Sequence, residues 1–394
     1  MSSSLISEKL AQACALVAES EFDAWVVFVR ETEEGGDPVL PLILDGTLTW
    51  QSALIITRSG EKIAVVGNYD ADPLVLCGDW DEVVPYVQSI RDPLVAVLER
   101  VCGSSPKIAV DFSVNDVKAD GLSHGMFLLM SSYLTGTRFE NCLVSAESLV
   151  MGLRGCKTPV EISRIRNAIA CGDEVFDVIS SFAAIGVSEL AIYEHTQSYI
   201  DGRGWGYGWD RSGNPIVNSG PDSMVGHGRP SPSITLQPGH IFHIDLGVIV
   251  DNYSSDIQRC WYVGETVPAD VVAACGAVNL AITLAAAVLR PGVSGWEVDA
   301  AARTSIVDSG YEEYMHALGH QVGRVAHDGG AVLGPRWERY GETPMTPILQ
   351  DAVFTLELGV MVPERGYFGL EEIVVVREDG CEFLSERQLS VPVI

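Results

Sequence analysis

The chain has little positive charge for its length. Its 394 residues include 25 Lys and Arg against 53 Asp and Glu, which gives a formal net charge of −28. A surface of this sign repels phosphate backbones and anionic lipid headgroups. We therefore expect neither a nucleic-acid partner nor a membrane partner.

Long apolar runs and paired cysteines are also missing. No uninterrupted apolar stretch approaches the ~20 residues of a membrane-spanning helix. The first twenty residues have an amphipathic helical pattern and lack the basic start and apolar run of a secretory signal. The nine cysteines are scattered and form no CxxC pair. Such usage is typical of a reducing compartment, so we expect a cytoplasmic protein with free thiols.

The length of the chain favours two domains of roughly 100–200 residues each. In the first part, the hydrophobic patterns predict strands at 24–29, 53–57, 62–66 and 108–112 and helices at 5–18, 92–101 and 121–134. Residues 57–62 predict a hairpin turn. Lys157 and Pro159 then stand at the start of a long helical pattern, where a polar residue and a proline are common. We therefore predict domains at 1–155 and 156–394, the second with further helices at 188–201, 268–289 and 295–309.

Two aspartates interrupt a strand-like stretch, HIDLGVIVDNYSSDIQR, at Asp245 and Asp256. Charged residues in such strands are costly unless something pairs with them. A tight reversal at residues 250–252 would place Asp245 directly opposite Asp256, with Cβ atoms about 4.5–5.5 Å apart. Two like charges at that separation need a shared proton or a cation. Further acidic residues downstream favour the metal ion.

A second acidic pair and a histidine-rich segment follow. TLELGVMVPERGYFGLEEIVVV places Glu357 and Glu371 fourteen residues apart, which suits a second antiparallel pair. Either glutamate alone could be an edge residue, but two such hairpins together indicate a site. In MHALGHQVGRVAHDGG, His316 and His320 are four apart and could share a helix face. The zinc motif HExxH is excluded because Ala317 follows the first histidine.

Four carboxylates and one imidazole form a hard, oxygen-rich donor set. Such a set can hold two divalent cations about 3.5–4 Å apart. No cysteine lies in a ligand pattern. We expect manganese, with cobalt or zinc as alternatives. A metal pair of this kind polarises a carbonyl and activates a water molecule.

The order Asp, Asp, His, Glu, Glu resembles the pita-bread metallopeptidases. DLGVIVDNYSSDIQR resembles the aspartate hairpin of that family, HALGHQVG its histidine segment, and LELG and LEEIVVV its two glutamate segments. The resemblance covers roughly residues 155–394 and is specific because all four segments occur in order. It implies an α/β (α+β) fold and these metal ligands: Asp245, Asp256, His320, Glu357 and Glu371.

The resemblance also implies catalytic roles. VNSGPDSMVGHGRP and AHDG resemble the segments that hold the family's substrate-contacting histidines, which here are His227 and His327. Both would donate to the scissile carbonyl or the developing oxyanion. Glu357 would also relay a proton to the leaving nitrogen. His316 is assigned to packing around the site. His243 shares the strand face of Asp245 but matches no ligand of the family.

The N-terminal region and KTPVEISRIRNA (157–168) resemble the branch that contains creatinase, aminopeptidase P and prolidase. The expected architecture is a creatinase-like mixed α/β domain followed by a pita-bread domain. Because all five ligands are present and the chain is compact, we expect hydrolysis of Xaa-Pro dipeptides, the prolidase reaction. The alternatives are an aminopeptidase P acting on longer peptides and a catalytically inactive binding module. We expect a homodimer or larger homo-oligomer, with the loop ETEEGGDPVLP (31–41) as a candidate cap.

Two further features bear on substrate recognition. Arg336 and Arg339, in GPRWERYG, could bind the free carboxylate of a dipeptide through the guanidinium fork, although exposed surface residues are the alternative. Relative to the family pattern, Met361 stands where a tyrosine is usual, and Gly369 stands where an arginine hydrogen bonds a ligand carboxylate. Tyr367 is a candidate to replace the tyrosine. These departures weaken the support around the metal ligands.

Overall fold

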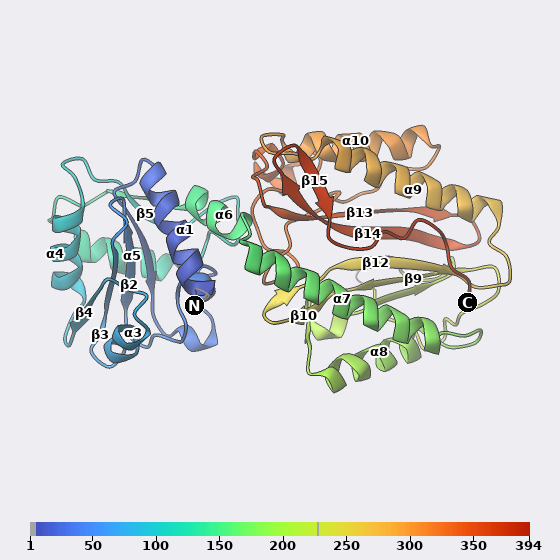
Figure 1. The fold of residues 1–394 in the computed structure, drawn as a ribbon, viewed down its shortest axis with the longest axis horizontal. Coiled ribbons are helices and arrows are strands. Elements are labelled where there is room, and N and C mark those ends of the chain that lie inside the picture. Colours follow the sequence, from blue (N-terminus) through green and yellow to red (C-terminus); the bar gives the residue numbers. More distant parts are fainter. Residues whose placement is uncertain (1–4, 227) are drawn as a thin grey trace. The chain divides into compact units, whose positions relative to one another are not determined.

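The computed structural model of the protein describes residues 5–226 and 228–394. The chain divides into two compact units, Met1–Arg154 and Gly155–Ile394. Each has its own hydrophobic core. Figure 1 shows the elements of both units in chain order.

The first unit is built on a six-stranded mixed sheet with strand order β4-β3-β2-β1-β5-β6. Its strands are β1 (Ala24–Val29), β2 (Ser52–Thr57), β3 (Lys62–Gly67), β4 (Glu82–Tyr86), β5 (Ile108–Val110) and β6 (Leu143–Ser145). Its helices are α1 (Leu5–Glu19), α2 (Leu40–Ile43), α3 (Ala71–Cys77), α4 (Arg91–Val101), α5 (His124–Leu134) and α6 (Glu147–Gly155), with a 3-10 turn η1 (Thr32–Glu34). The predicted hairpin between β2 and β3 is confirmed by their antiparallel pairing.

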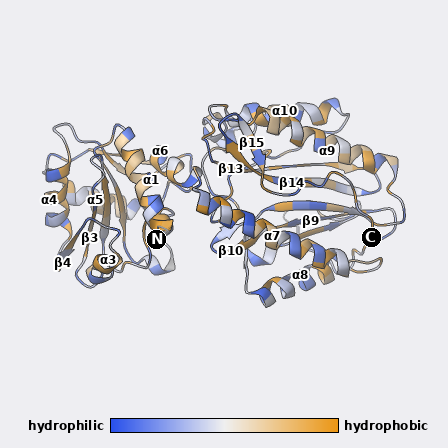
Figure 2. Cartoon of the chain, in the orientation of Figure 1, coloured by the Kyte–Doolittle hydropathy of each residue, from blue (hydrophilic) through white to orange (hydrophobic). Residues whose placement is uncertain are grey.

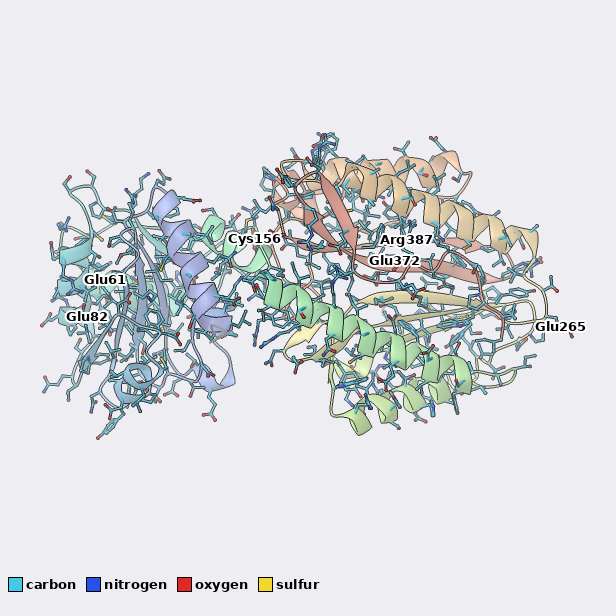
Figure 3. All side chains as sticks on the ribbon, viewed as in Figure 1. Glu61, Glu82, Cys156, Glu265, Glu372 and Arg387 are labelled. Atoms are coloured by element: carbon cyan, nitrogen blue, oxygen red, sulfur yellow. The ribbon has the colours of Figure 1, made fainter. Side chains whose placement is uncertain are left out.

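Strand β1 forms the centre of this unit because both of its faces are buried. Trp25 and Val27 belong to one core cluster, and Val26 and Phe28 belong to the other. A strand covered on both sides has a continuous apolar sequence, AWVVFV, in place of an alternating one. At the edge, Arg100 of α4 pairs with Glu61 and Glu82, which are labelled in Figure 3.

The second unit contains a curved main sheet and a small one. The main sheet has strand order β13-β14-β12-β9-β8 with β15 paired to β14, and the small sheet has order β11-β10-β7. The strands are β7 (Gly206–Tyr207), β8 (Ile216–Ser219), β9 (Ile241–Leu246), β10 (Val248–Val250), β11 (Tyr253–Ser254), β12 (Ile257–Tyr262), β13 (Val353–Val362), β14 (Gly366–Arg377) and β15 (Gly380–Phe383). The helices are α7 (Pro159–Phe182), α8 (Glu189–Arg203), α9 (Ala269–Val288) and α10 (Gly295–Asp308), with 3-10 turns η2 (Arg211–Gly213), η3 (Glu338–Tyr340) and η4 (Thr343–Met345).

The long helices begin where the sequence provides caps. At α7, the Thr158 side chain accepts from the backbone of Glu161, whose carboxylate accepts from the backbone of Thr158, and Pro159 occupies the first turn. Ser294 and Glu297 form the same reciprocal capping box at α10. These bonds satisfy backbone donors that have no partner within the helix. The helices predicted from Pro159 and at 295–309 are therefore confirmed.

The aspartate hairpin turns at two residues, not three. Asp251 and Asn252 have φ values of 51° and 63°, the geometry of a two-residue type I′ turn. This turn pairs Val250 with Tyr253 and Asp245 with Gln258. The prediction that Asp245 lies opposite Asp256 is therefore wrong by two residues. A shift of two positions keeps both aspartates on one face of the sheet, because side chains alternate with a period of two.

The second hairpin has the predicted register, since Glu357 of β13 lies directly opposite Glu371 of β14. Gln258 of β12 pairs with Asp245 on one side and with Glu371 on the other. Four residues therefore form one continuous row across β9, β12, β14 and β13: Asp245, Gln258, Glu371 and Glu357. Residues paired in this way point to the same face.

The opposite face of the main sheet carries apolar side chains that pack under helices. Phe242 and Trp261 lie against each other with ring centroids 5.3 Å apart, and Trp261 lies 6.2 Å from Phe176 of α7. Leu358 and Leu370 pack in the core that contains α9. The helices thus cover one face and leave the acidic row on the other.

Helix α9 is long and apolar enough, by composition alone, to cross a membrane. The expectation of no such segment overlooked it, because Asn279 and Thr283 interrupt the apolar run. Eight of its residues are buried, and seven of them join the core formed with β13 and β14. Figure 2 shows the apolar character of this helix beside the sheet. A core helix meets the same criteria of length and hydropathy as a membrane span.

Candidate metal centre

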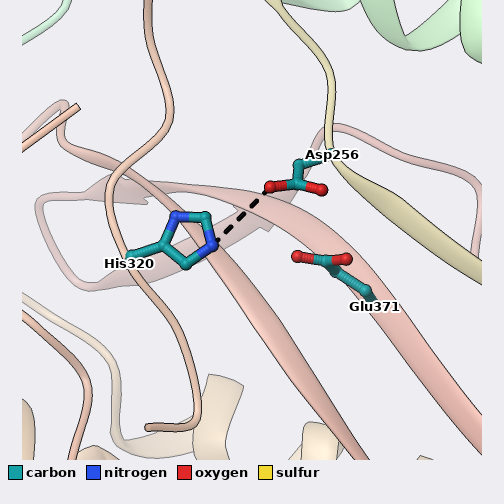
Figure 4. Close-up of side chains that lie close together, drawn as sticks. All are labelled: Asp256, His320 and Glu371. Atoms are coloured by element: carbon teal, nitrogen blue, oxygen red, sulfur yellow. Dashed lines mark ion pairs between the residues drawn. The ribbon is translucent and has the colours of Figure 1, made fainter. Parts of the chain in front are cut away.

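Three of the predicted ligands converge from distant parts of the chain. Atoms of Asp256, His320 and Glu371 that could bind a metal all lie within 4.8 Å of one another. Figure 4 shows the two carboxylates and the imidazole facing a common point. The Nε2 atom of His320 lies 3.6 Å from Oδ2 of Asp256. These residues come from the segment before β12, the segment before β13, and β14 itself.

The other two predicted ligands adjoin this group. Oε1 of Glu357 lies 3.5 Å from Nε2 of His320, and Glu357 lies opposite Glu371. Asp245 is close enough for its charge to raise the pKa of Asp256, Glu357 and Glu371. The structure therefore brings all five residues together on one face of the main sheet.

Burial dominates the electrostatics of this cluster. It raises the pKa of Asp245 to about 7, and burial together with the Asp245 charge raises the pKa of Glu357 to about 8. The pKa values of Asp256 and Glu371 lie well above their usual range, from burial first and from neighbouring carboxylates second. Burial and the nearby His327 lower the pKa of His320 to about 3. The four carboxyl groups thus resist deprotonation unless a cation compensates their charge, and the His320 imidazole stays neutral.

Several carboxylate oxygens of the cluster have no hydrogen-bond partner within residues 5–226 and 228–394. Among the described residues, Oδ1 of Asp245 and both carboxylate oxygens of Glu371 are buried without a hydrogen-bond partner. Buried carboxylates without partners are strongly unfavourable. A divalent cation coordinated by these oxygens and by neutral His320 would satisfy them. The residues present therefore fit a divalent metal centre.

His320 is positioned by an extended segment that runs beside β13. Its backbone N–H donates to Oγ1 of Thr355, and its carbonyl accepts from the backbone N–H of Thr355. A Cβ atom on Gly319 would lie 2.0 Å from the carbonyl oxygen of Thr355, so only glycine fits there. The prediction that His316 and His320 share a helix face is therefore wrong. His316 packs against Tyr314, with ring centroids 5.2 Å apart.

A buried ion pair anchors the far end of this segment. Nζ of Lys157 lies 2.6 Å from Oδ2 of Asp328, with the two side chains 1% and 3% exposed. The backbone N–H of Asp328 donates to the carbonyl of Gln321. Lys157 lies just before α7, so the pair ties the segment that carries His320 and His327 to the start of that helix.

The remaining predicted site residues have different surroundings. The exposed ring of His327 lies edge-on to His320, with centroids 4.1 Å apart. His227 lies outside the described residues. Arg336 and Arg339 are exposed: Arg336 lies over the ring of Trp296, and Arg339 donates to the carbonyl of Met315. In the described part of the chain, neither arginine pairs with a residue of the metal cluster.

Gln258 is the site residue that the sequence interpretation missed. It lies at the centre of the acidic row, and its Nε2 donates to Oε2 of Glu357 at 3.1 Å. The available signal was its position two residues after Asp256, which places both on one strand face. Glu372, labelled in Figure 3, alternates to the other face and pairs there with Arg259.

Comparison with known proteins identifies the family of this fold. The profile of metallopeptidase family M24 matches residues 163–378. The chain is 29% identical over 263 residues to an uncharacterized peptidase, YqhT, of Bacillus subtilis (strain 168), which covers 66% of this chain and 69% of that protein. It is 26% identical over 363 residues to an Xaa-Pro dipeptidase of Lactobacillus delbrueckii subsp. lactis, which covers 88% and 92% of the two chains.

Solved structures show the same fold over nearly the whole length. An Xaa-Pro dipeptidase from Bacillus anthracis matches with a TM-score of 0.73 and 21% identity, covering 99% of this chain and 100% of that one. An X-Pro aminopeptidase from Thermotoga maritima matches with a TM-score of 0.69 and 24% identity, covering 98% and 99%. The chain therefore belongs to metallopeptidase family M24 and has its pita-bread fold.

Proposed function

We propose that this protein is a two-metal Xaa-Pro dipeptidase. The observation that carries the proposal is the cluster of four carboxylates, two buried and two half-buried, and one imidazole on the face of the sheet opposite the helices. Membership of a metallopeptidase family supports hydrolysis of a peptide bond. The Xaa-Pro dipeptidase relative, which matches most of the chain, supports the choice of substrate.

The cluster would hold two divalent cations, for which we propose manganese, with cobalt or zinc as alternatives. The proposed ligands are Asp245, Asp256, His320, Glu357 and Glu371. Four carboxylates carry enough charge to balance two such ions, and their oxygens are the ligands that hard cations prefer. When bound, the cations polarise the substrate carbonyl and activate water.

Residues of the chain would orient the substrate and move the proton. Glu357 is only partly buried and would pass a proton to the imide nitrogen that leaves when the Xaa-Pro bond breaks. His327 is exposed beside His320 and would donate a hydrogen bond to the scissile carbonyl. His227 would donate a second one, as its sequence segment implies.

The free carboxylate of a dipeptide needs a cationic partner, and Arg336 or Arg339 would supply it. A guanidinium fork matches the two carboxylate oxygens. Both side chains are exposed, however: Arg336 lies over the ring of Trp296, and Arg339 donates to the carbonyl of Met315. Neither arginine forms an ion pair with the cluster in the part of the chain that the structure describes, so a second candidate is an aminopeptidase P that removes the first residue from longer Xaa-Pro peptides. We further propose a cytoplasmic homodimer or larger homo-oligomer in which residues 31–41 limit peptide length.

The test is proline release from an Xaa-Pro dipeptide and from a longer Xaa-Pro peptide, with the metal-stripped protein and after addition of Mn²⁺. We expect Mn²⁺-dependent cleavage of the dipeptide and none of the longer peptide. Glu357→Gln keeps the shape of the side chain and should abolish cleavage. Cleavage of the longer peptide would move the assignment to aminopeptidase P. Cleavage of neither, with metal bound, would favour an inactive binding module.

A further inference from the structure

A row of buried polar side chains leads from a surface loop to the proposed metal cluster. Nδ2 of Asn218 donates to Oγ of Ser223 and to the carbonyl of Met224, at 3.0 and 2.8 Å. Its Oδ1 therefore faces Nδ1 of His243, 3.2 Å away. Asn218 and His243 are buried. Burial lowers the pKa of His243 to about 4, so its ring is neutral and carries a single N–H. It therefore donates either to Asn218 or to the neighbour of Nε2, and not to both.

The chain continues from His243 to a proposed ligand. Nε2 of His243 lies 3.0 Å from Oε1 of Gln258, and Nε2 of Gln258 donates to Oε2 of Glu357 at 3.1 Å. A primary amide can present either its oxygen or its NH₂ group to a neighbour. In the tautomer with its proton on Nε2, His243 donates to the oxygen of Gln258, and the NH₂ end of Gln258 donates to the carboxylate. The other oxygen of Glu357, Oε1, is left facing His320.

The packing around Gln258 explains why residue 369, on the adjacent strand β14, is a glycine. A Cβ atom on Gly369 would lie 3.0 Å from Oε1 of Gln258 and 2.4 Å from the ring of Tyr367. The ring of Tyr367 in turn lies edge-on to His243, with centroids 5.0 Å apart. The arginine usual at position 369 would therefore collide with this group. Gln258 supplies a donor to a ligand carboxylate where that arginine is missing.

We propose that Gln258 and His243 are positioning residues for Glu357, with His243 acting through Gln258; the inference rests on the proposed metal centre and peptidase function. Neither side chain would touch the substrate. Their task is to fix one oxygen of Glu357 so that the other stays directed at the site. Outer hydrogen bonds of this kind orient metal-bound carboxylates and set their affinity for the ion.

The test is the affinity of the full-length protein for Mn²⁺, measured by calorimetric titration without substrate. Gln258→Met keeps the length of the side chain and removes its hydrogen bonds, so we expect Mn²⁺ affinity to fall about 10–100-fold. His243→Leu should lower the Mn²⁺ affinity to a similar extent. The double variant should bind Mn²⁺ no more weakly than the weaker-binding of the two single variants, because the two residues act in series. His243→Gln returns an N–H donor and should recover most of the affinity. With dipeptide, Gln258→Met should lower kcat and leave KM nearly unchanged.

Gln197→Met is the matched control. Gln197 is also buried and donates to two backbone carbonyls, those of Arg211 and Asn214, away from the cluster. Its substitution should leave Mn²⁺ affinity within about twofold even if the melting temperature falls. Equal weakening by Gln197→Met, unchanged affinity in Gln258→Met, or fully additive effects of the two site variants would overturn the inference.

The same titration separates this inference from the proposed function. If the wild-type protein binds Mn²⁺ and releases no proline, the dipeptidase assignment fails, and the affinities of the variants still decide the role of Gln258. If wild-type affinity and cleavage are as expected but Gln258→Met binds normally, only the inference fails. A wild-type protein that binds no Mn²⁺ would overturn both.

Discussion

Both units of the protein bury carboxyl groups, but they treat them differently. In the first unit, Asp111 accepts from Nε1 of Trp25 at 2.5 Å, and Asp37 accepts from the backbone N–H of Val39 at 2.9 Å. In the second unit, neither oxygen of Glu371 has a hydrogen-bond partner among the described residues. Among the described residues, Oδ2 of Asp37 and Oδ2 of Asp111 are also buried without a hydrogen-bond partner, but each group acts on the pKa of the other, so one proton shared between them would satisfy both. The second cluster gathers four carboxylates, and we propose that a cation completes it.

The comparison predicts its largest effect for single ligand changes. Glu371→Gln and Asp256→Asn should each lower the Mn²⁺-dependent activity by roughly 10³-fold, because several kcal/mol of electrostatic stabilisation by the metal is lost. The measurement is kcat/KM for an Xaa-Pro dipeptide at saturating Mn²⁺. Asp111→Asn in the first unit is the control and should change kcat/KM by less than about twofold. An equal loss from both kinds of variant would erase the distinction between the two units.

Asp328, another buried carboxylate, has a cation of its own in Lys157. Lys157→Met would remove the cation that pairs with this carboxylate, whose side chain is 3% exposed. Breaking a buried pair in this way costs about 3–5 kcal/mol in the free energy of unfolding. Urea denaturation should show this loss. The double variant Lys157→Met/Asp328→Leu should recover part of it, since no charge is then left buried; a single variant as stable as the wild type would contradict this reading.

Metal should stabilise the second unit and not the first. Mn²⁺ at about 100 times its dissociation constant should add about 2.7 kcal/mol to the free energy of unfolding per site. Thermal melts with and without Mn²⁺ give the shift. Asp111→Asn should keep the full shift, and Glu371→Gln should lose most of it. A shift that persists in Glu371→Gln would place the ion elsewhere.

The smallest effect is on the pH dependence of the metal-free protein. The folded-state pKa values of Asp245 and Glu357 are raised to about 7 and about 8, above those of an unfolded chain. Their folded forms therefore bind more protons than the unfolded chain, and stability falls as pH rises from about 4 to 8. We expect the melting temperature of the stripped protein to fall by a few degrees between pH 5 and pH 8, and Mn²⁺ to reverse the trend. A rise over that range without metal would contradict the assignment.

Much of the fold follows from local pattern. Strand β1 occupies the predicted residues because burial on both faces gives it an unbroken apolar run. Strand β4 was missed because Pro85 and partly exposed residues conceal its pattern. Helix α5 begins at His124, three residues after its predicted start, because the Ser123 side chain caps it. The partial exposure of β4 in the folded unit and the side-chain cap at Ser123 decided these differences. The hydrophobic period of the sequence specifies neither of them.

The site residues also divide into those that the sequence predicts and those that it does not. The resemblance to the family's motifs implies the five proposed ligands, and the fold gathers them on one face. The role of Gln258 could not be predicted, because it depends on the hairpin register. Two turn geometries at residues 250–253 place the same side chains on the same face but pair Asp245 with different partners. The contacts of His243 depend on that register as well.

The most direct test of the account is the number of Mn²⁺ ions bound per chain, measured by equilibrium dialysis and elemental analysis of the stripped and reloaded protein. The account predicts two ions per chain in the wild type and in Asp111→Asn, and fewer than two in Glu371→Gln. A wild-type protein that binds none, or a Glu371→Gln variant that still binds two, would contradict the claim that this carboxylate cluster is a two-metal centre.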